Sequence, residues 1–120
     1  MATTIVDTGT WVINLIHPTV IQRGQTSRFK ASFKHVKDGF VDLTTPTLKF
    51  YDGTDTQVST TQTPNQTDLG KGEYKKDFTF SNTLATGTYV AEWGGTYTDT
   101  DGIASTIFIR QTFIIKSGKA

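Results

Sequence analysis

Cysteine is absent from the 120-residue sequence, and the formal net charge is only +1. Without cysteine the chain can hold neither a disulfide framework nor a thiolate metal site, and it has no cysteine nucleophile. The small net charge provides no overall field that would attract nucleic acid or an anionic membrane. The sequence also lacks any run of about 18 apolar residues, so no segment is expected to span a membrane.

Catalytic signatures are missing as well. The two histidines, His17 and His35, lack the spacing of a zinc motif, and no serine lies in a Gly-x-Ser-x-Gly elbow. Gly94 and Gly95 are not followed by the lysine and hydroxyl residues of a phosphate-binding loop. The acidic residues lie mostly in turns and show no spacing that favours a catalytic pair. The sequence therefore predicts a protein that is not an enzyme and uses no cofactor or metal.

Two weaker ligand signals have simpler interpretations. The acidic turns at 52–55 and 99–102 could offer oxygens to calcium, but neither continues into a long loop that ends in glutamate, so ordinary turn chemistry is favoured. Four basic residues form a row along one predicted strand and its turn: Arg28, Lys30, Lys34 and Lys37. The aromatic residues of that strand point to the opposite face, so we interpret the row as a solvated sheet face and expect no nucleic-acid partner.

The residues that are abundant favour β-structure. Threonine makes up about a fifth of the chain, and β-branched and aromatic residues fill much of the rest. Asp-Gly turn signals stand at 38–39, 52–53 and 101–102, and no segment has helical periodicity of useful length. The length fits one domain over residues 1–120, with residues 1–10 as a candidate extended N-terminal arm.

Apolar and polar residues alternate in several segments, as expected for strands with one buried face. The clearest are residues 26–36 and 84–93, and a short apolar run at 11–16 is rich in β-branched residues. The polar segment 61–70 is expected to be a loop. Turns at intervals of about 8–12 residues predict an antiparallel β-sandwich of about seven to nine strands. The expected core contains Phe29, Phe33, Leu48, Phe50, Tyr89, Ala91, Trp93, Ile109 and Phe113.

The order Leu84-x-x-Gly87-x-Tyr89 resembles the tyrosine corner of immunoglobulin-like sandwiches. There, a tyrosine at the start of a late strand hydrogen-bonds to upstream backbone. Antibody domains carry a cysteine two residues after this tyrosine, whereas this chain has Ala91. The resemblance therefore implies an immunoglobulin-like antiparallel sandwich without a disulfide.

A longer series of motifs extends the resemblance over nearly the whole chain. It includes the Leu-x-Phe-Tyr-Asp-Gly segment at 48–53 and two Gly-x-Tyr strand starts, at 72–74 and 87–89. The series resembles small immunoglobulin-like proteins of tailed-bacteriophage virions and of bacterial surface modules. The surface modules usually form repeats in long secreted chains, whereas this sequence is a single domain. The resemblance therefore favours a virion structural protein.

Within a virion, the expected role is a capsid decoration (cement) protein that binds the major capsid protein. A neck or tail accessory protein is the alternative, and self-association into a homo-oligomer stays open. A second class of function is carbohydrate or cell-surface binding through aromatic residues such as Trp11, Tyr51 and Tyr97. The segment 1–7 has no basic or continuous apolar stretch, so no secretory signal is expected, and assembly would take place in the host cytoplasm.

The expected partner interface comprises the first and last predicted strands, because these two carry apolar residues on both faces. The residues assigned to this interface are Trp11, Ile13, Leu15, Phe108 and Ile114. Residues 11–16 have two interpretations: a first strand packed inside the sandwich, or a strand that docks one face onto a partner, because a strand near a terminus has few covering elements of its own.

Overall fold

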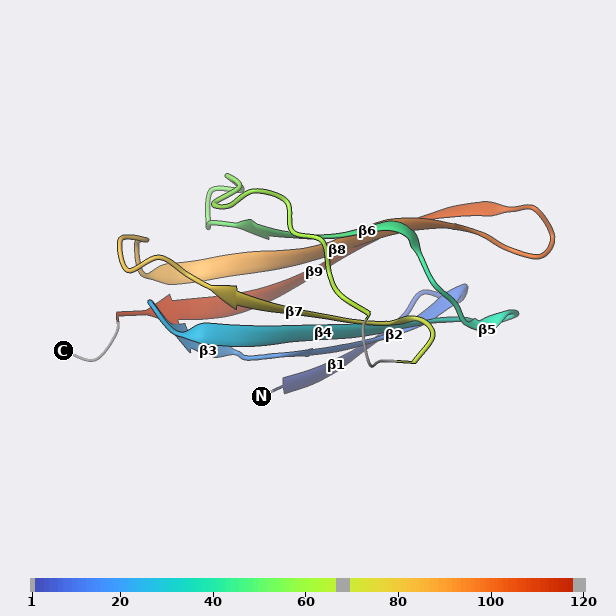
Figure 1. Ribbon diagram of the computed structural model, residues 1–120, viewed down its shortest axis with the longest axis horizontal. Helices are drawn as coiled ribbons and strands as arrows, with labels where there is room; N and C mark the ends of the chain where they lie inside the picture. The colour runs from blue at the N-terminus through green and yellow to red at the C-terminus, as the bar shows by residue number, and fades with distance from the viewer. Residues whose placement is uncertain (1, 67–69, 118–120) are drawn as a thin grey trace.

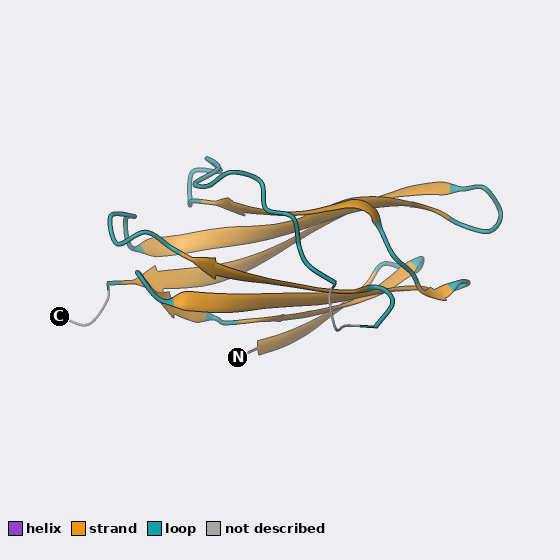
Figure 2. Cartoon of the chain, viewed as in Figure 1, coloured by secondary structure: helices purple, strands orange, loops and turns teal. Residues whose placement is uncertain are grey.

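The computed structural model describes residues 2–66 and 70–117, which form strands, turns and loops without a helix (Figures 1 and 2). None of the described residues form a helix long and apolar enough to cross a membrane. The described residues form nine strands: β1 (Ala2–Asp7), β2 (Trp11–His17), β3 (Val20–Gln22), β4 (Thr26–His35), β5 (Gly39–Phe40), β6 (Thr44–Tyr51), β7 (Glu73–Thr79), β8 (Gly87–Thr98) and β9 (Ala104–Lys116).

The strands form two sheets packed as a sandwich. In the first sheet β1 pairs with β2 and β2 with β4, and the other edge of β4 is shared by β7 and β5. The second sheet has the order β3-β9-β8-β6. All pairs are antiparallel except β3 with β9, because the chain crosses from one sheet to the other at Pro18 and Thr19. The all-β, two-sheet part of the predicted fold is confirmed.

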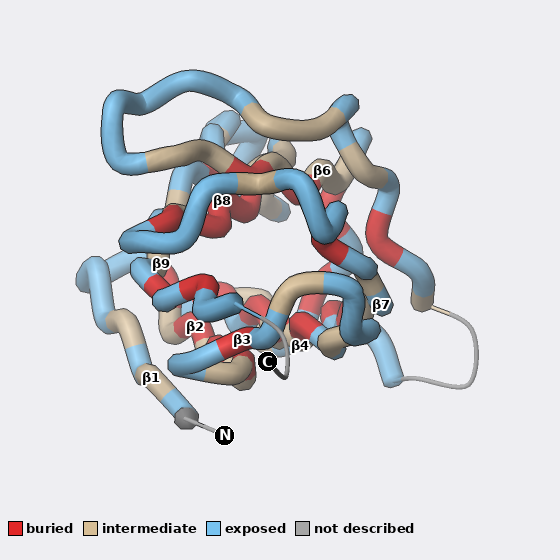
Figure 3. The backbone as a smooth tube through the Cα atoms, turned by 90° about the vertical axis from the view of Figure 1, so that its left-hand side faces the viewer, coloured by how far each residue is buried: buried red, intermediate tan, exposed pale blue. Residues whose placement is uncertain are grey.

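The core lies between the two sheets, where buried residues from both face one another (Figure 3). It is unusually aromatic: Phe50 lies 5.0 Å from Phe29 and from Phe80 between ring centroids, and Phe113 also packs against this group. Eight of the nine predicted core residues are buried, and Ile109 is half-buried at the margin. Alternation along β4, β6, β8 and β9 therefore identified the inward face correctly.

The predicted interface assignment was wrong for β2. Trp11, Ile13 and Leu15 are at most 4% exposed and belong to the core. Both faces of this strand carry apolar residues, but the face with Val12 and Ile16 is the outer one and is only half-covered. The pattern alone did not distinguish the two faces.

The predicted N-terminal arm also needs revision. Residues 2–7, expected as part of an extended arm, form β1 and pair with β2 along its whole length, while Met1 lies outside the described residues. Of residues 40–43 only Phe40 belongs to a strand, and residues 57–60 contribute only a single bridge. In the predicted 61–70 loop, residues 67–69 lie outside the described residues.

Two local contacts explain how β7 and β8 begin. Gly72 has φ +77°, and an added Cβ would lie 2.8 Å from the Phe33 carbonyl oxygen and 2.9 Å from that of Val41, so only glycine fits there. The Tyr89 hydroxyl donates a 2.5 Å hydrogen bond to the Ala85 carbonyl oxygen. This bond satisfies the hydroxyl of an otherwise buried tyrosine and secures the chain's entry into β8.

Candidate protein-binding edge

The two long sides of the sandwich end differently. On the side formed by β6 and β7, residues 57–65 run alongside the strands and close them. Leu48 and Gln62 exchange two backbone hydrogen bonds of 2.9 and 2.8 Å, and Val58 donates to the Phe50 carbonyl. Asn65 exchanges two backbone bonds with Lys75 of β7. We call this side the closed side.

The opposite side, formed by β1 and β9, is the open side. Within the described part of the chain, β9 pairs on this side only with β3, over residues 114–116. The Ile114 amide donates to the Thr19 carbonyl across this pair, so even-numbered β9 residues direct their backbone groups away from β8. The β8–β9 register runs without a shift from Gly87 to Thr98. The same direction therefore holds for Thr106, Phe108, Arg110 and Thr112.

The free part of β9, residues 104–113, lacks the features that usually protect an edge strand. It contains no lysine and no proline, and no bulge bends it away. The closed side differs on each point: β6 contains Pro46 and a register shift between Thr44 and Thr47, and β7 carries Lys75. An unprotected edge of this length is a template for pairing with another strand.

A cleft of about 360 Å³ runs beside this edge, between β9 and the turn that joins β1 to β2. Its floor is formed by the buried side chains of Trp11 and Ile13, and β9 forms one wall. The Gln111 side chain donates a 2.7 Å hydrogen bond to the Thr4 hydroxyl and so ties the two sheets together farther along the same side. The residues that line the cleft are Thr8, Thr10, Trp11, Ile13, Ser105, Thr106, Ile107, Phe108 and Ile109.

The predicted interface residues of β9 do lie on the surface. Phe108 is 62% exposed and Ile114 is 43% exposed, both on the outer face of the second sheet. The structure thus separates the five predicted residues: the two on β9 lie on the surface, and the three on β2 lie in the core, where Trp11 and Ile13 also line the cleft. Cleft and edge together offer backbone hydrogen-bonding groups and apolar surface, which is what an extended peptide strand requires.

A charged cluster fixes the outer face next to this edge. Arg110 donates 2.8 Å to the Glu92 carboxylate and 2.7 Å to Asp55, and its guanidinium lies over the rings of Tyr51 and Phe108. The pKa of Arg110 is raised mainly by its hydrogen bond to Glu92 and secondly by its hydrogen bond to Asp55. Desolvation and the neighbouring Glu92 charge raise the pKa of the Tyr51 hydroxyl. The one charge on the free part of β9 is therefore already paired.

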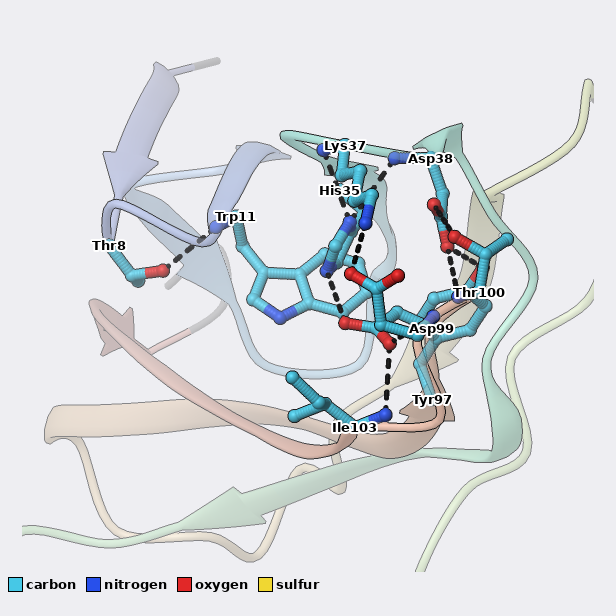
Figure 4. A network of polar contacts seen from close by, with 10 residues as sticks. Thr8, Trp11, His35, Lys37, Asp38, Tyr97, Asp99, Thr100 and Ile103 are labelled. Carbon is cyan, nitrogen blue, oxygen red and sulfur yellow. Dashed lines mark hydrogen bonds and ion pairs between the residues drawn. The ribbon is translucent and has the colours of Figure 1, made fainter.

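A second polar cluster, drawn in Figure 4, holds the turn between β8 and β9 against the turn after β4. Asp38 accepts hydrogen bonds from the Tyr97 hydroxyl, at 2.7 Å, and from the Thr100 amide and hydroxyl. The bond from Tyr97 lowers the pKa of Asp38 and raises the pKa of Tyr97 to about 12. Lys37 forms an ion pair with Asp101 in the same region. We call this cluster the clasp.

His35 and Trp11 complete the clasp on its inner side. His35 is 3% exposed, and its Nδ1 accepts bonds from the backbone amides of Lys37 and Asp38. Its ring meets Trp11 edge-on at 5.0 Å, and the second ring nitrogen, Nε2, lies 3.8 Å from an Asp99 carboxylate oxygen. His35 lies on the inward face of β4 with Phe33, and no sequence pattern indicated that Asp99 would lie next to it.

The remaining candidate ligand sites have structural roles. Asp52 and Asp99 each use one carboxylate oxygen to accept backbone amides of their own turns. Among the described residues, no group of three or more histidines and acidic residues is placed to hold a metal. In the basic row, Arg28 pairs with Asp77 across two hydrogen bonds, and Lys30 lies opposite Lys75 on the outer face of the first sheet.

No protein-family model and no curated protein matches this sequence. The candidate site is therefore defined by geometry alone: a regular strand edge, an exposed aromatic ring and an adjoining cleft lined by both hydroxyl and apolar side chains.

Proposed function

We propose that this chain is a non-enzymatic structural protein that is built into a larger protein assembly through the open side. The observation that supports the proposal most strongly is the free β9 edge, which combines unpaired backbone groups with the exposed ring of Phe108. A buried or protected edge would serve stability alone, whereas an unprotected edge beside a cleft that offers both hydroxyl and apolar side chains suits a protein partner.

The assembly that we propose is a tailed-bacteriophage virion, in which the chain decorates the capsid shell and binds the major capsid protein. The support is the resemblance to immunoglobulin-like virion proteins, and the strand arrangement agrees with it. One sheet contains β2-β4-β7 and the other β6-β8-β9, with β3 parallel to the last strand, an order that suits an immunoglobulin-like sandwich. The hydrogen bond from Tyr89 to the Ala85 backbone suits a tyrosine corner. Assembly in the host cytoplasm belongs to the same proposal.

The carbohydrate-binding alternative receives no support from the residues named for it. Trp11 is buried, and the Tyr97 hydroxyl is bonded to Asp38. The face of Tyr51 is covered by the guanidinium of Arg110, 4.9 Å from its ring centroid. Sugar rings stack on open aromatic faces, and none of these three side chains offers one.

The experiment mixes the purified chain with undecorated capsid shells of the phage that encodes it and, separately, with its necks and tails. Bound protein is measured by light scattering and sedimentation. Saturation at a fixed ratio of chain to shell protein is the expected result. Binding to the neck or tail instead would replace decoration with the accessory role, and a chain that binds no virion part would overturn the proposal.

A further inference from the structure

We propose that residues 17–22 form an acid-sensitive latch, which the neutral ring of His17 holds closed against β9 and which protonation of that ring releases. Every group that the latch uses belongs to the chain itself, so this inference goes beyond the proposed function and holds for any partner of the open side. Its consequence for the open side is a longer free edge, because residues 114–116 of β9 lose their pairing with β3 when the latch opens.

His17 occupies the last position of β2, directly before the crossing at Pro18 and Thr19. Its side chain is 3% exposed and lies on the inward face, in line with the other odd-numbered residues of the strand. Those other residues are all apolar and belong to the core. The row of inward side chains therefore ends in a titratable ring, at a place in the interior where a gain of charge is costly.

The hydrogen bonds of His17 define its protonation state. Its Nδ1 lies 2.9 Å from the Pro18 carbonyl oxygen. Because a carbonyl oxygen only accepts, Nδ1 carries the proton of the neutral ring and Nε2 carries the lone pair. Within the described part of the chain, Nε2 is buried and has no hydrogen-bond partner. Protonation would turn this nitrogen into a charged donor without an acceptor, which costs more than an unpaired neutral acceptor.

No carboxylate points toward His17 from the inner faces of the strands that the structure describes. The titratable side chains on those faces are His35, Tyr74, Lys76, Tyr89 and Tyr97. The charged residues of β1, β4 and β9 lie on the outer faces: Asp7, Arg28, Lys30, Lys34, Arg110 and Lys116. Burial lowers the pKa of His17, the bond to Pro18 opposes this only in part, and no charge of a described residue contributes. A protonated ring would therefore gain no ion pair in exchange for its burial.

The bond to Pro18 connects the ring to the pairing of β3 with β9. The next carbonyl along the chain, that of Thr19, accepts the Ile114 amide at 2.9 Å. Strand β3 itself is only three residues long, and Ile21 is its one buried residue. A ring that leaves the interior to solvate its charge takes the Pro18 carbonyl with it, so we expect the adjacent Thr19 bond to break first. Local opening of this kind needs far less than unfolding of the whole sandwich.

The latch responds to pH in a definite range. Because the pKa of His17 in the folded chain lies below the ordinary histidine value of 6.5, its contribution to stability is complete above pH 6.5 and is lost as the pH falls toward the folded pKa. Within that range the open form binds one proton more, so each pH unit should favour opening by up to about tenfold. Four carboxyl groups have pKa values below the ordinary 3.8 and titrate outside this range: Asp38, Asp42, Asp52 and Asp77.

The test measures hydrogen exchange of backbone amides by NMR on the isolated chain, between pH about 7 and about 5. After correction for the intrinsic rate at each pH, the opening constant of the Ile114 amide should rise by up to about tenfold per pH unit below 6.5. His17→Asn is the matched variant, because its side-chain amide can donate the same hydrogen bond but does not titrate. Its Ile114 opening constant should not change with pH.

The Gln62 amide, which donates to the Leu48 carbonyl on the closed side, separates local from global opening. Its opening constant should stay unchanged, and a rise equal to that of Ile114 would mean unfolding of the whole chain and would overturn the latch. An Ile114 opening constant that does not rise, or that rises equally in His17→Asn, also overturns it. If His17→Asn does not fold, the wild type decides alone: a His17 ring that titrates with a midpoint above pH 6.5 contradicts the inference.

These measurements contain no shell or other virion part, so their outcome is independent of the proposed function. If the latch fails and the chain still binds shells, the proposed function stands without it. If the latch opens as expected and the chain binds no virion part, the inference stands and the proposed function fails.

Discussion

The closed and open sides of this sandwich solve the same physical problem in opposite ways. Both end in strands whose backbone groups need partners. On the closed side the chain supplies them itself, through Gln62 and Asn65. On the open side the groups from Thr106 to Thr112 face outward, beside a cleft floored by Trp11. This chain therefore closes the edge formed by β6 and β7 with its own backbone and leaves the edge of β9, where we propose a partner, uncovered.

The largest expected effect concerns the floor of the open side. Trp11→Ala removes a side chain that is 4% exposed and packs edge-on against His35 and Tyr97. Loss of a buried tryptophan should lower the free energy of unfolding by about 3–5 kcal/mol. Urea denaturation followed by Trp93 fluorescence measures this value. A loss below about 1 kcal/mol would mean that Trp11 is a surface anchor after all.

A smaller loss is expected where the closed side begins. Gly72→Ala places a methyl group against the carbonyl oxygens of Phe33 and Val41 at a φ of +77°. The clash and the backbone strain together should cost about 1–3 kcal/mol. Gly102→Ala is the matched control, since Gly102 has φ +81° with no atom near its added Cβ. Equal losses in urea denaturation would show that the strain alone, and not the close packing, is responsible.

How far the sequence anticipated these sides depends on the kind of interaction. Period-2 alternation identified the inward residues of β4 and β8, because burial on one face leaves a direct pattern. It did not resolve β2, where Val12 and Ile16 make the outer face apolar too. The closure by Gln62 and Asn65 uses backbone groups of polar residues, so no side-chain pattern announces it. The sequence also gives no pattern for the free edge of β9, because a free edge is the lack of a neighbouring strand.

Opening the closed side tests whether closure prevents self-association there. Gln62→Pro removes the amide that donates to the Leu48 carbonyl, a 2.8 Å bond on the edge of β6. The loss of this bond should cost about 1–2 kcal/mol in urea denaturation. The freed edge should also make the chain self-associate, visible in sedimentation. Thr63→Pro, one residue along, is the control; if it associates equally, the bond to Leu48 is not what protects β6.

The clasp gives the open side a pH dependence. The folded pKa of Tyr97, about 12, lies above the value of about 10 for an unfolded tyrosine. Its contribution to stability is therefore complete below pH about 10 and is lost as the pH rises toward 12. Wild type should be more stable than Tyr97→Phe at pH 7, and the gap should close between pH 10 and 12. A gap that stays constant over this range would show that the bond to Asp38 does not hold the turn.

The smallest effect on the free energy of unfolding is expected at Phe108, which lines the same cleft as Trp11. Phe108→Ala removes a ring that is 62% exposed, so the free energy of unfolding of the dilute monomer should change by about 0.5 kcal/mol or less. The contrast with Trp11→Ala matters because the two residues line one cleft from two sheets. Removing a core side chain lowers the free energy of unfolding, whereas removing a side chain that only contacts a partner leaves the stability of the monomer unchanged. If Phe108→Ala destabilises the monomer by more than about 2 kcal/mol, Phe108 supports the fold and the open side loses its one exposed aromatic contact.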